Sequence, residues 1–135
     1  MRKIRMKLKR GRQIMGDISH HFNRYEVECK CGCGLDSMDA VTLQLADESR
    51  DFVGHSITPS SGCRCYAYNR TKEVGSNDRS QHPRCRAMDL PVQDPRGLWE
   101  YLCQSYPERY GFILYNTFVH VDSRSGPKYH KDTTA

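Results

Sequence analysis

The segment 118–122, Phe-Val-His-Val-Asp, alternates strictly between two kinds of side chain. Successive side chains of a β-strand point to opposite faces, so this alternation favours a strand with one apolar and one polar face. We expect Val119 and Val121 to pack on the core. Phe118, His120 and Asp122 then share the other face, where an imidazole and a carboxylate stand side by side. The segment therefore predicts a sheet that carries chemistry on the face turned away from its core.

The other apolar patterns predict a mixture of helices and further strands. We expect helices at 37–53 and 94–106, a helical turn at 65–72, and strands at 56–59, 86–90, 110–115 and 118–122. We expect the first helix to bury Met38, Val41, Leu45 and Phe52. The polar residues from 123 onward are predicted to be a loop. Because strands and helices do not alternate regularly, the fold class predicted is α+β, with a small antiparallel sheet flanked by helices.

Basic residues are concentrated at the N-terminus. Seven of the 21 Lys and Arg residues precede Asp17, so residues 17–135 carry 14 basic against 16 acidic side chains. We divide the chain into a basic N-terminal arm, residues 1–16, and a single domain, residues 17–135. Apolar and basic residues alternate over 4–9, which suits a strand added to a partner's sheet; the alternative is a mobile tail attracted to polyanions. A nucleic-acid-binding domain would spread its cations over a folded face, so we expect no specific nucleic-acid partner.

Hydrophobic runs are short throughout the chain. No stretch approaches the ~20 apolar residues of a membrane-spanning helix, so we expect no membrane span. The basic N-terminus lacks the apolar run of a secretory signal, and we therefore expect a protein made in the cytoplasm without a signal peptide.

The seven Cys residues are an odd number, so they cannot all pair in disulfides. For a chain made in a reducing cytosol we expect thiols that are free or metal-bound. Cys29, Cys31 and Cys33 are separated by single residues, and together with Cys65 they form either a structural zinc site or a group of packed free thiols. Alternate residues of an extended strand are about 6.6 Å apart, which favours packed free thiols.

His82, Asp89 and His120 are of the types that a hydrolytic zinc site uses. Such a site takes three protein ligands of His and carboxylate type and keeps a fourth position for water. In an extended chain, residues 82 and 89 would lie roughly 23 Å apart, so the chain must reverse between them. We expect His82 on a loop and Asp89 on the returning strand. The spacing alone is common among surface residues, and its meaning depends on the motifs around it.

Those motifs occur in a definite order. They are SGCRC at 61–65, YN at 68–69, VG at 74–75, SQHPRCRAMD at 80–89 and FVHVD at 118–122. Together with Phe22 and the run CKCGCG at 29–34, this order resembles the zinc D-alanyl-D-alanine carboxypeptidase family over about residues 20–124. The family includes L-alanyl-D-glutamate endopeptidases and phage endolysins, and it shares its fold with the hedgehog signalling domain.

The resemblance implies a zinc-dependent peptidase that hydrolyses peptide bonds in peptidoglycan stem peptides, as a carboxypeptidase or an endopeptidase. The Zn²⁺ ligands that it implies are His82, Asp89 and His120. It also implies that Arg64 holds the carboxylate or the polarised carbonyl of the substrate. Ser80 and Gln81 would line the same rim and contact the substrate.

Three positions depart from the family's pattern. The family usually has Tyr and Gly where this chain has Cys63 and Cys85, and the second of these places a side chain beside the metal loop. Many members have an acidic general base three residues before the last zinc His, where this chain has Thr117. We nominate Asp122 as the catalytic carboxylate; the alternative is that it only orients a ligand or pairs with Arg124.

Two functions are therefore expected. The first is a phage-type lysis enzyme, or endolysin, or a virion-associated enzyme that acts at the bacterial cell wall. The second is a catalytically weak or inactive structural or binding component of a phage particle with the same zinc-binding fold, whose arm contacts other virion proteins.

Overall fold

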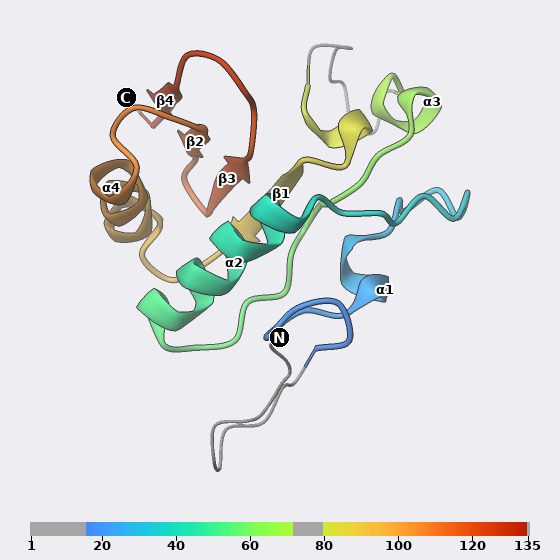
Figure 1. Cartoon of the computed structure of the whole chain (residues 1–135), viewed down its shortest axis with the longest axis horizontal. Coiled ribbons are helices and arrows are strands. Elements are labelled where there is room, and N and C mark those ends of the chain that lie inside the picture. The colour runs from blue at the N-terminus through green and yellow to red at the C-terminus, as the bar shows by residue number, and fades with distance from the viewer. Residues whose placement is uncertain (1–15, 72–79, 135) are drawn as a thin grey trace.

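The computed structural model describes residues 16–71 and 80–134 (Figure 1). Residues 1–15 of the predicted basic arm, and the Val74-Gly75 motif, lie outside the described residues. The helical elements are α1 (Arg24–Val27), α2 (Ala40–Val53), α3 (Tyr66–Asn69), the short 3-10 helix η1 (His82–Arg84) and α4 (Pro95–Ser105). The strands are β1 (Ala87–Pro91), β2 (Gly111–Leu114), β3 (Phe118–Asp122) and β4 (Tyr129–Asp132).

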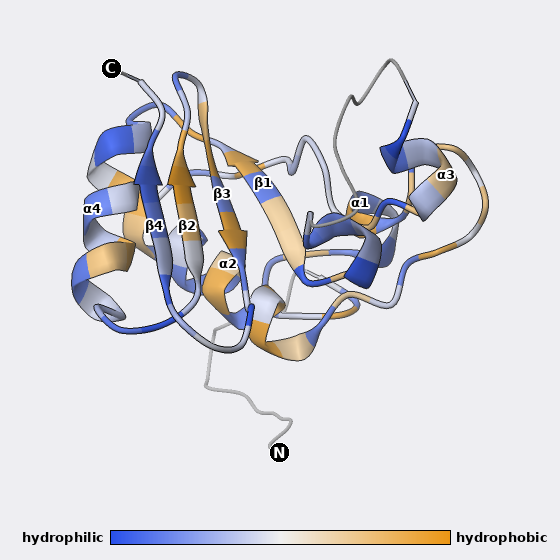
Figure 2. Ribbon diagram, turned by 90° about the horizontal axis from the view of Figure 1, so that it is seen from above, coloured by the Kyte–Doolittle hydropathy of each residue, from blue (hydrophilic) through white to orange (hydrophobic). Residues whose placement is uncertain are grey.

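The four strands form one sheet in the order β1-β3-β2-β4. Strand β3 pairs antiparallel with β1 and with β2, whereas β4 runs parallel to β2. Helices α2 and α4 lie along one face of the sheet, and α1 and α3 lie beyond β1, at the edge of the sheet opposite β4 (Figures 1 and 2). A four-stranded sheet flanked by helices confirms the predicted α+β class.

The core fills the space between the sheet and helices α2 and α4. Val119 and Val121 of β3 are completely buried, as predicted, and they pack with apolar side chains of the neighbouring strands, Met88, Leu90, Phe112 and Leu114. Helix α4 adds Leu98 and Leu102, both fully buried. Residues 118, 120 and 122 consequently face away from the core, on the face of the sheet opposite helices α2 and α4.

Helix α2 has a side-chain cap at its start and a glycine cap at its end. The Asp39 side chain accepts a hydrogen bond from the Thr42 backbone N–H, and Gly54 ends the helix in the left-handed conformation at φ 75°. The helix buries Leu43, Leu45 and Ala46. The expected inner positions Val41 and Phe52 are wrong, because they are 38% and 48% exposed.

Two predictions at the sheet edges are wrong. Residues 56–59 form no strand, but the residues that follow pair with β1 through an isolated bridge between Ser61 and Asp89. The C-terminal segment, predicted to be a loop, contains β4, which makes the sheet mixed rather than wholly antiparallel. Figure 2 shows why the pattern missed it, since β4 is coloured as hydrophilic next to the apolar β2. No helix within residues 16–71 and 80–134 is long and apolar enough to cross a bilayer.

Candidate metal centre

His82, Asp89 and His120 converge on one point of the face of the sheet opposite helices α2 and α4. Asp89 and His120 are directly opposite each other in the antiparallel pair of β1 and β3. The Oδ1 atom of Asp89 lies 3.0 Å from Nδ1 of His120 and 3.4 Å from Nε2 of His82. One possible ligand atom from each residue lies within 4.8 Å of those of the other two. The three side chains are 3–13% exposed, so the group is sheltered but open to a ligand.

Each imidazole is oriented by a hydrogen bond from its other ring nitrogen. The Nδ1 atom of His82 lies 2.6 Å from the carbonyl oxygen of Gly62, which can only accept, so Nδ1 donates and Nε2 keeps its lone pair. The Nε2 atom of His120 lies 2.7 Å from Oδ2 of Asp122, and Nδ1 therefore faces Asp89. Metal-binding histidines in proteins are oriented in this way, by a carbonyl or a carboxylate on the second nitrogen.

The charges of the group favour a cation. Burial raises the pKa of Asp89, but the hydrogen bond from His120 and the nearby ring of His82 outweigh it and hold this pKa far below its usual range. Burial lowers the pKa of His82, which keeps this imidazole neutral. Burial also acts to lower the pKa of His120, but the bonds to Asp122 and Asp89 outweigh it and raise the value to about 9.

The turn between His82 and Asp89 reverses the chain in the way that the spacing demands. His82 opens η1, where Pro83 fits the first turn of a helix, and Cys85 follows with φ 53°, in the left-handed region. The hydroxyl of Ser80 accepts a hydrogen bond from the His82 backbone N–H at 3.2 Å. The carbonyl of Gln81 accepts from the backbone N–H groups of residues 84 and 86. Ser80 and Gln81, predicted to contact substrate, therefore also build the loop that carries His82.

Cys85 is joined to Cys63 by a disulfide. For this pair, the expectation of free or metal-bound thiols is wrong. The disulfide explains why this chain departs from the family's pattern at both positions, because a cysteine at either one needs the other as its partner. The bond ties the loop after Gly62 to the end of η1, and so fixes the two segments that orient His82.

Arg64 lies beside the carboxylate of the group. Its Nη2 atom is 3.9 Å from Oδ2 of Asp89, and its side chain is only 11% exposed. Burial lowers the pKa of the guanidinium, and the nearby charge of Asp89 opposes that shift. The Nε–H of Arg64 is buried without a hydrogen-bond partner within the described residues. A buried cation with an unused donor is suited to an anionic or carbonyl oxygen of a bound molecule.

Asp122 is completely buried, and its contacts favour the second role left open for it, that of orienting a ligand. Its oxygens accept hydrogen bonds from His120 Nε2 and from Nε and Nη2 of Arg124. Burial raises the pKa of this carboxyl, but the bonds from Arg124 and His120 outweigh it and hold the pKa far below its usual range. Gly111, opposite Asp122 on β2, leaves room for the carboxylate, since a Cβ at this position would collide with it.

Sequence reasoning missed two other residues of the site. Gly62 supplies the carbonyl that orients His82, and a Cβ on it would be 2.7 Å from the Val27 carbonyl oxygen. Tyr115 stacks on Phe118, with ring centroids 4.4 Å apart. It also lies within range of the negative charge of Asp89. Burial and that charge both raise the pKa of Tyr115. Its position just before a predicted turn was the one available signal.

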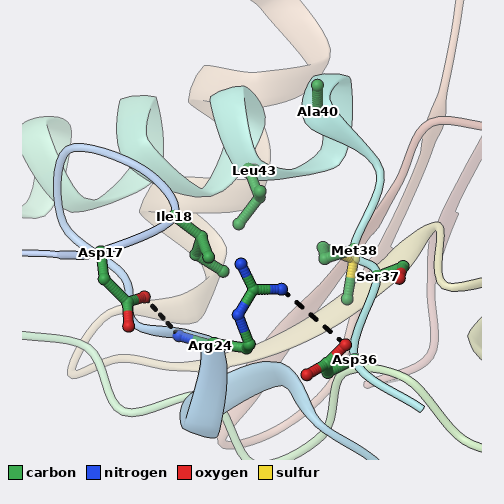
Figure 3. A pocket seen from close by; sticks show the side chains of 8 residues that line it. All are labelled: Asp17, Ile18, Arg24, Asp36, Ser37, Met38, Ala40 and Leu43. Atoms are coloured by element: carbon green, nitrogen blue, oxygen red, sulfur yellow. Dashed lines mark hydrogen bonds and ion pairs between the residues drawn. The ribbon is translucent and has the colours of Figure 1, made fainter.

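A separate cavity of about 480 Å³ lies between the start of α1 and the start of α2 (Figure 3). Arg24 points into it and contacts Asp36 at 3.8 Å, while the Arg24 backbone N–H donates to Asp17. Both carboxylates of this cavity are bonded to Arg24, and none of the residues that line it belongs to the His/Asp/His group.

A small α+β domain with two oriented imidazoles, a carboxylate and a buried arginine at one point defines the class of a candidate metal-dependent hydrolase. The chain belongs to the peptidase M15 family, whose family model matches residues 20–122. The family resemblance seen in the motifs is thereby confirmed, and the protein is a peptidase by family. No curated protein matches the chain.

Proposed function

We propose that the protein is a zinc-dependent peptidase that hydrolyses peptide bonds in peptidoglycan stem peptides. The observation that carries the proposal is the convergence of His82, Asp89 and His120, with Arg64 beside them, in a chain of the peptidase M15 family. The acceptor atoms of the three ligands, two nitrogens and an oxygen, suit Zn²⁺ and leave one tetrahedral position for water.

Zinc would be held by Nε2 of His82, a carboxylate oxygen of Asp89 and Nδ1 of His120. When bound, zinc lowers the pKa of its water toward ~7 and polarises a carbonyl oxygen. The chain's own residues orient the zinc ligands and bind the substrate. Gly62 and Asp122 keep the imidazoles in the required tautomers, and Arg64 is available to bind a carboxylate of the stem peptide.

The test is to digest purified muropeptides with the full chain and to identify the products by mass spectrometry, together with the metal content of the protein. We expect the His82→Ala variant to lose one equivalent of zinc and all hydrolysis while its circular dichroism is unchanged. His55→Ala, at an imidazole that bonds to the Ser56 carbonyl beyond the end of α2, is the matched control. Full hydrolysis by His82→Ala would reject the site.

The second candidate function is a catalytically weak or inactive binding component of a phage particle. It is favoured by Thr117, which stands where many relatives have an acidic base, and by the engagement of both oxygens of Asp122 with His120 and Arg124. If Asp122 serves as the proton acceptor, it has to exchange these bonds during the reaction. Stoichiometric zinc with no cleavage of any muropeptide would support this second function.

The proposed place of action is the bacterial cell wall, for an endolysin or a virion-associated enzyme. The support is the chemistry of the proposed substrate and the composition of the basic arm, seven of whose side chains are Lys or Arg. Anionic wall polymers would attract such a segment. Contacts of the arm with other virion proteins are the alternative under the second function.

A further inference from the structure

Four cysteine side chains meet outside the His/Asp/His group. The sulfur atoms of Cys29, Cys31, Cys33 and Cys65 all lie within 4.8 Å of one another. Cys31 is 3.5 Å from Cys29 and 3.7 Å from Cys65, measured between sulfur atoms. Four thiolates around one Zn²⁺ at ~2.3 Å stand roughly 3.8 Å apart, the edge of a regular tetrahedron. The four sulfurs are therefore close enough to one another to be ligands of a single tetrahedral ion.

The backbone between the cysteines is folded, not extended, which removes the argument from strand spacing. The Gly32 N–H donates to the Cys29 carbonyl at 3.2 Å, which closes a tight turn. Gly32 and Gly34 have φ of 86° and 92°, a conformation that glycine adopts without strain. The Cys29 N–H in turn bonds to the Leu35 carbonyl at 2.8 Å. Glycines in these two places let cysteines at alternate positions aim at one centre.

Packing does not explain this group of thiols. Cys29 is buried, but Cys31 and Cys33 are exposed, so they gain little from the burial that usually places a free cysteine. Their convergence with Cys65, which is 32 residues beyond Cys33 in the chain, closes a loop at an entropic cost. A bond to a shared ion would offset that cost, whereas contacts between exposed thiols do not.

Backbone N–H groups also point at the sulfurs, as they do toward thiolates. The Cys65 N–H donates to Cys29 Sγ at 3.3 Å, and the Tyr68 N–H donates to Cys65 Sγ at 3.4 Å.

We propose that Cys29, Cys31, Cys33 and Cys65 bind a second, structural Zn²⁺ as a tetrathiolate site. The ion joins the turn at 29–33 to the start of α3. Cys65 directly follows Arg64, whose backbone N–H donates to the His82 carbonyl. The second ion therefore holds in place the segment that presents the buried arginine to the first site.

The test is to count metal ions in the full chain, purified without chelator, by elemental analysis, and to record the absorption spectrum of the cobalt-loaded protein. We expect two ions per chain, and one in the Cys31→Ser/Cys33→Ser variant. Because both cysteines are exposed, this variant is expected to keep its fold. With cobalt, we expect a thiolate-to-metal charge-transfer band in the unmodified chain and in His82→Ala, and its loss in the double cysteine variant.

Cys103→Ser is the matched control, because Cys103 is a half-buried thiol of α4 outside the group. It should keep both ions and the charge-transfer band. The proposal is overturned if the cobalt spectrum has no such band, if the double variant retains the metal content of the unmodified chain, or if peptide mapping finds the four cysteines linked as disulfides. None of these outcomes depends on hydrolysis, so failure here and failure of the proposed peptidase activity are distinguishable.

Discussion

His120 and Asp122 share one face of β3, and the Nε2–H of His120 donates to Oδ2 of Asp122 at 2.7 Å. The carboxylate is also bound by Arg124 and is completely buried. The pair aims Nδ1 of His120 at Asp89, so the geometry of the candidate metal centre depends on a residue that is not one of its proposed ligands.

The first prediction concerns this pair. We expect Asp122→Asn to weaken zinc binding by ~10–100-fold, the usual cost of losing a carboxylate that orients a metal-binding histidine. A positioning role predicts that excess zinc restores most hydrolysis. If Asp122 is instead the proton acceptor, zinc affinity stays unchanged and hydrolysis is not restored at any zinc concentration. Competition with a fluorescent zinc chelator, followed by hydrolysis assays across zinc concentrations, separates the two.

The second prediction uses the missing side chain at Gly111. A Cβ at this position collides with the Asp122 carboxylate, so we expect Gly111→Ala to turn His120 away from Asp89 and to weaken zinc binding by roughly the same factor as Asp122→Asn. Gly97→Ala is the matched control, since its Cβ meets another carboxylate, that of Asp94, at the cap of α4. Equal zinc affinities in the two variants would contradict this account of Gly111.

The third prediction concerns the disulfide between Cys63 and Cys85. It closes a loop with a sequence separation of 22 residues, and removal of such a loop closure costs roughly 3 kcal/mol. We expect Cys63→Ser/Cys85→Ser to lower the free energy of unfolding in urea by about that amount, and to weaken zinc binding because the loop carries His82. Cys103→Ser should leave both quantities close to their original values. A double variant as stable as the unmodified chain would show that the bond does not form in solution.

The fourth prediction is a pH dependence at the start of α2. Burial raises the pKa of Asp39, but hydrogen bonds from Ser123 and Thr42 outweigh it and lower the pKa below its usual value. A carboxyl with a lowered pKa in the folded state stabilises the fold above its unfolded pKa of ~3.9, and the contribution is lost as the pH falls through the folded pKa. We expect Asp39→Asn to be less stable than the unmodified chain at pH 7, with a difference that shrinks steadily below pH ~4. Urea unfolding at a series of pH values measures it, and a difference independent of pH would be the contrary result.

The fifth prediction tests the basic arm. We expect replacement of its seven Lys and Arg residues by Gln to reduce binding to purified cell walls severalfold at low ionic strength. Salt screens attraction between exposed charges, with a Debye length of about 10 Å at 0.1 M and shorter above it. The two proteins should therefore bind equally in high salt. Sedimentation with walls, with Gln substitutions of basic residues on the folded domain as a control, checks the effect.

The sequence was sufficient where one local pattern determined the structure. Strand β3 was predicted with its bounds and both faces, because strict alternation admits one arrangement. The long helices were also found, from capping residues such as Gly54. The face of α2 was partly wrong, since Phe52 fits the helical period but stacks at the surface on Tyr101, with ring centroids 4.1 Å apart.

The rest depended on contacts between distant segments. Strand β4 carries exposed polar side chains and is held through its backbone by β2, so hydropathy contained no signal for it. The disulfide and the group of four thiols bring together residues far apart in the chain, and spacing does not specify which cysteines pair. The spacing of an extended strand, which weighed against a zinc site at 29–33, does not apply because Gly32 and Gly34 turn the chain there.

The direct pairing of Asp89 with His120 across β1 and β3 makes the proposed metal binding depend on the alignment of the two strands. If β3 slipped by one residue, Asp89 would lie opposite a valine, and both its carboxylate and the imidazole would no longer face each other. A misaligned sheet would hence be unable to hold the ion, whatever its overall compactness. Uptake of metal during refolding would then report the moment at which these two strands reach their native register.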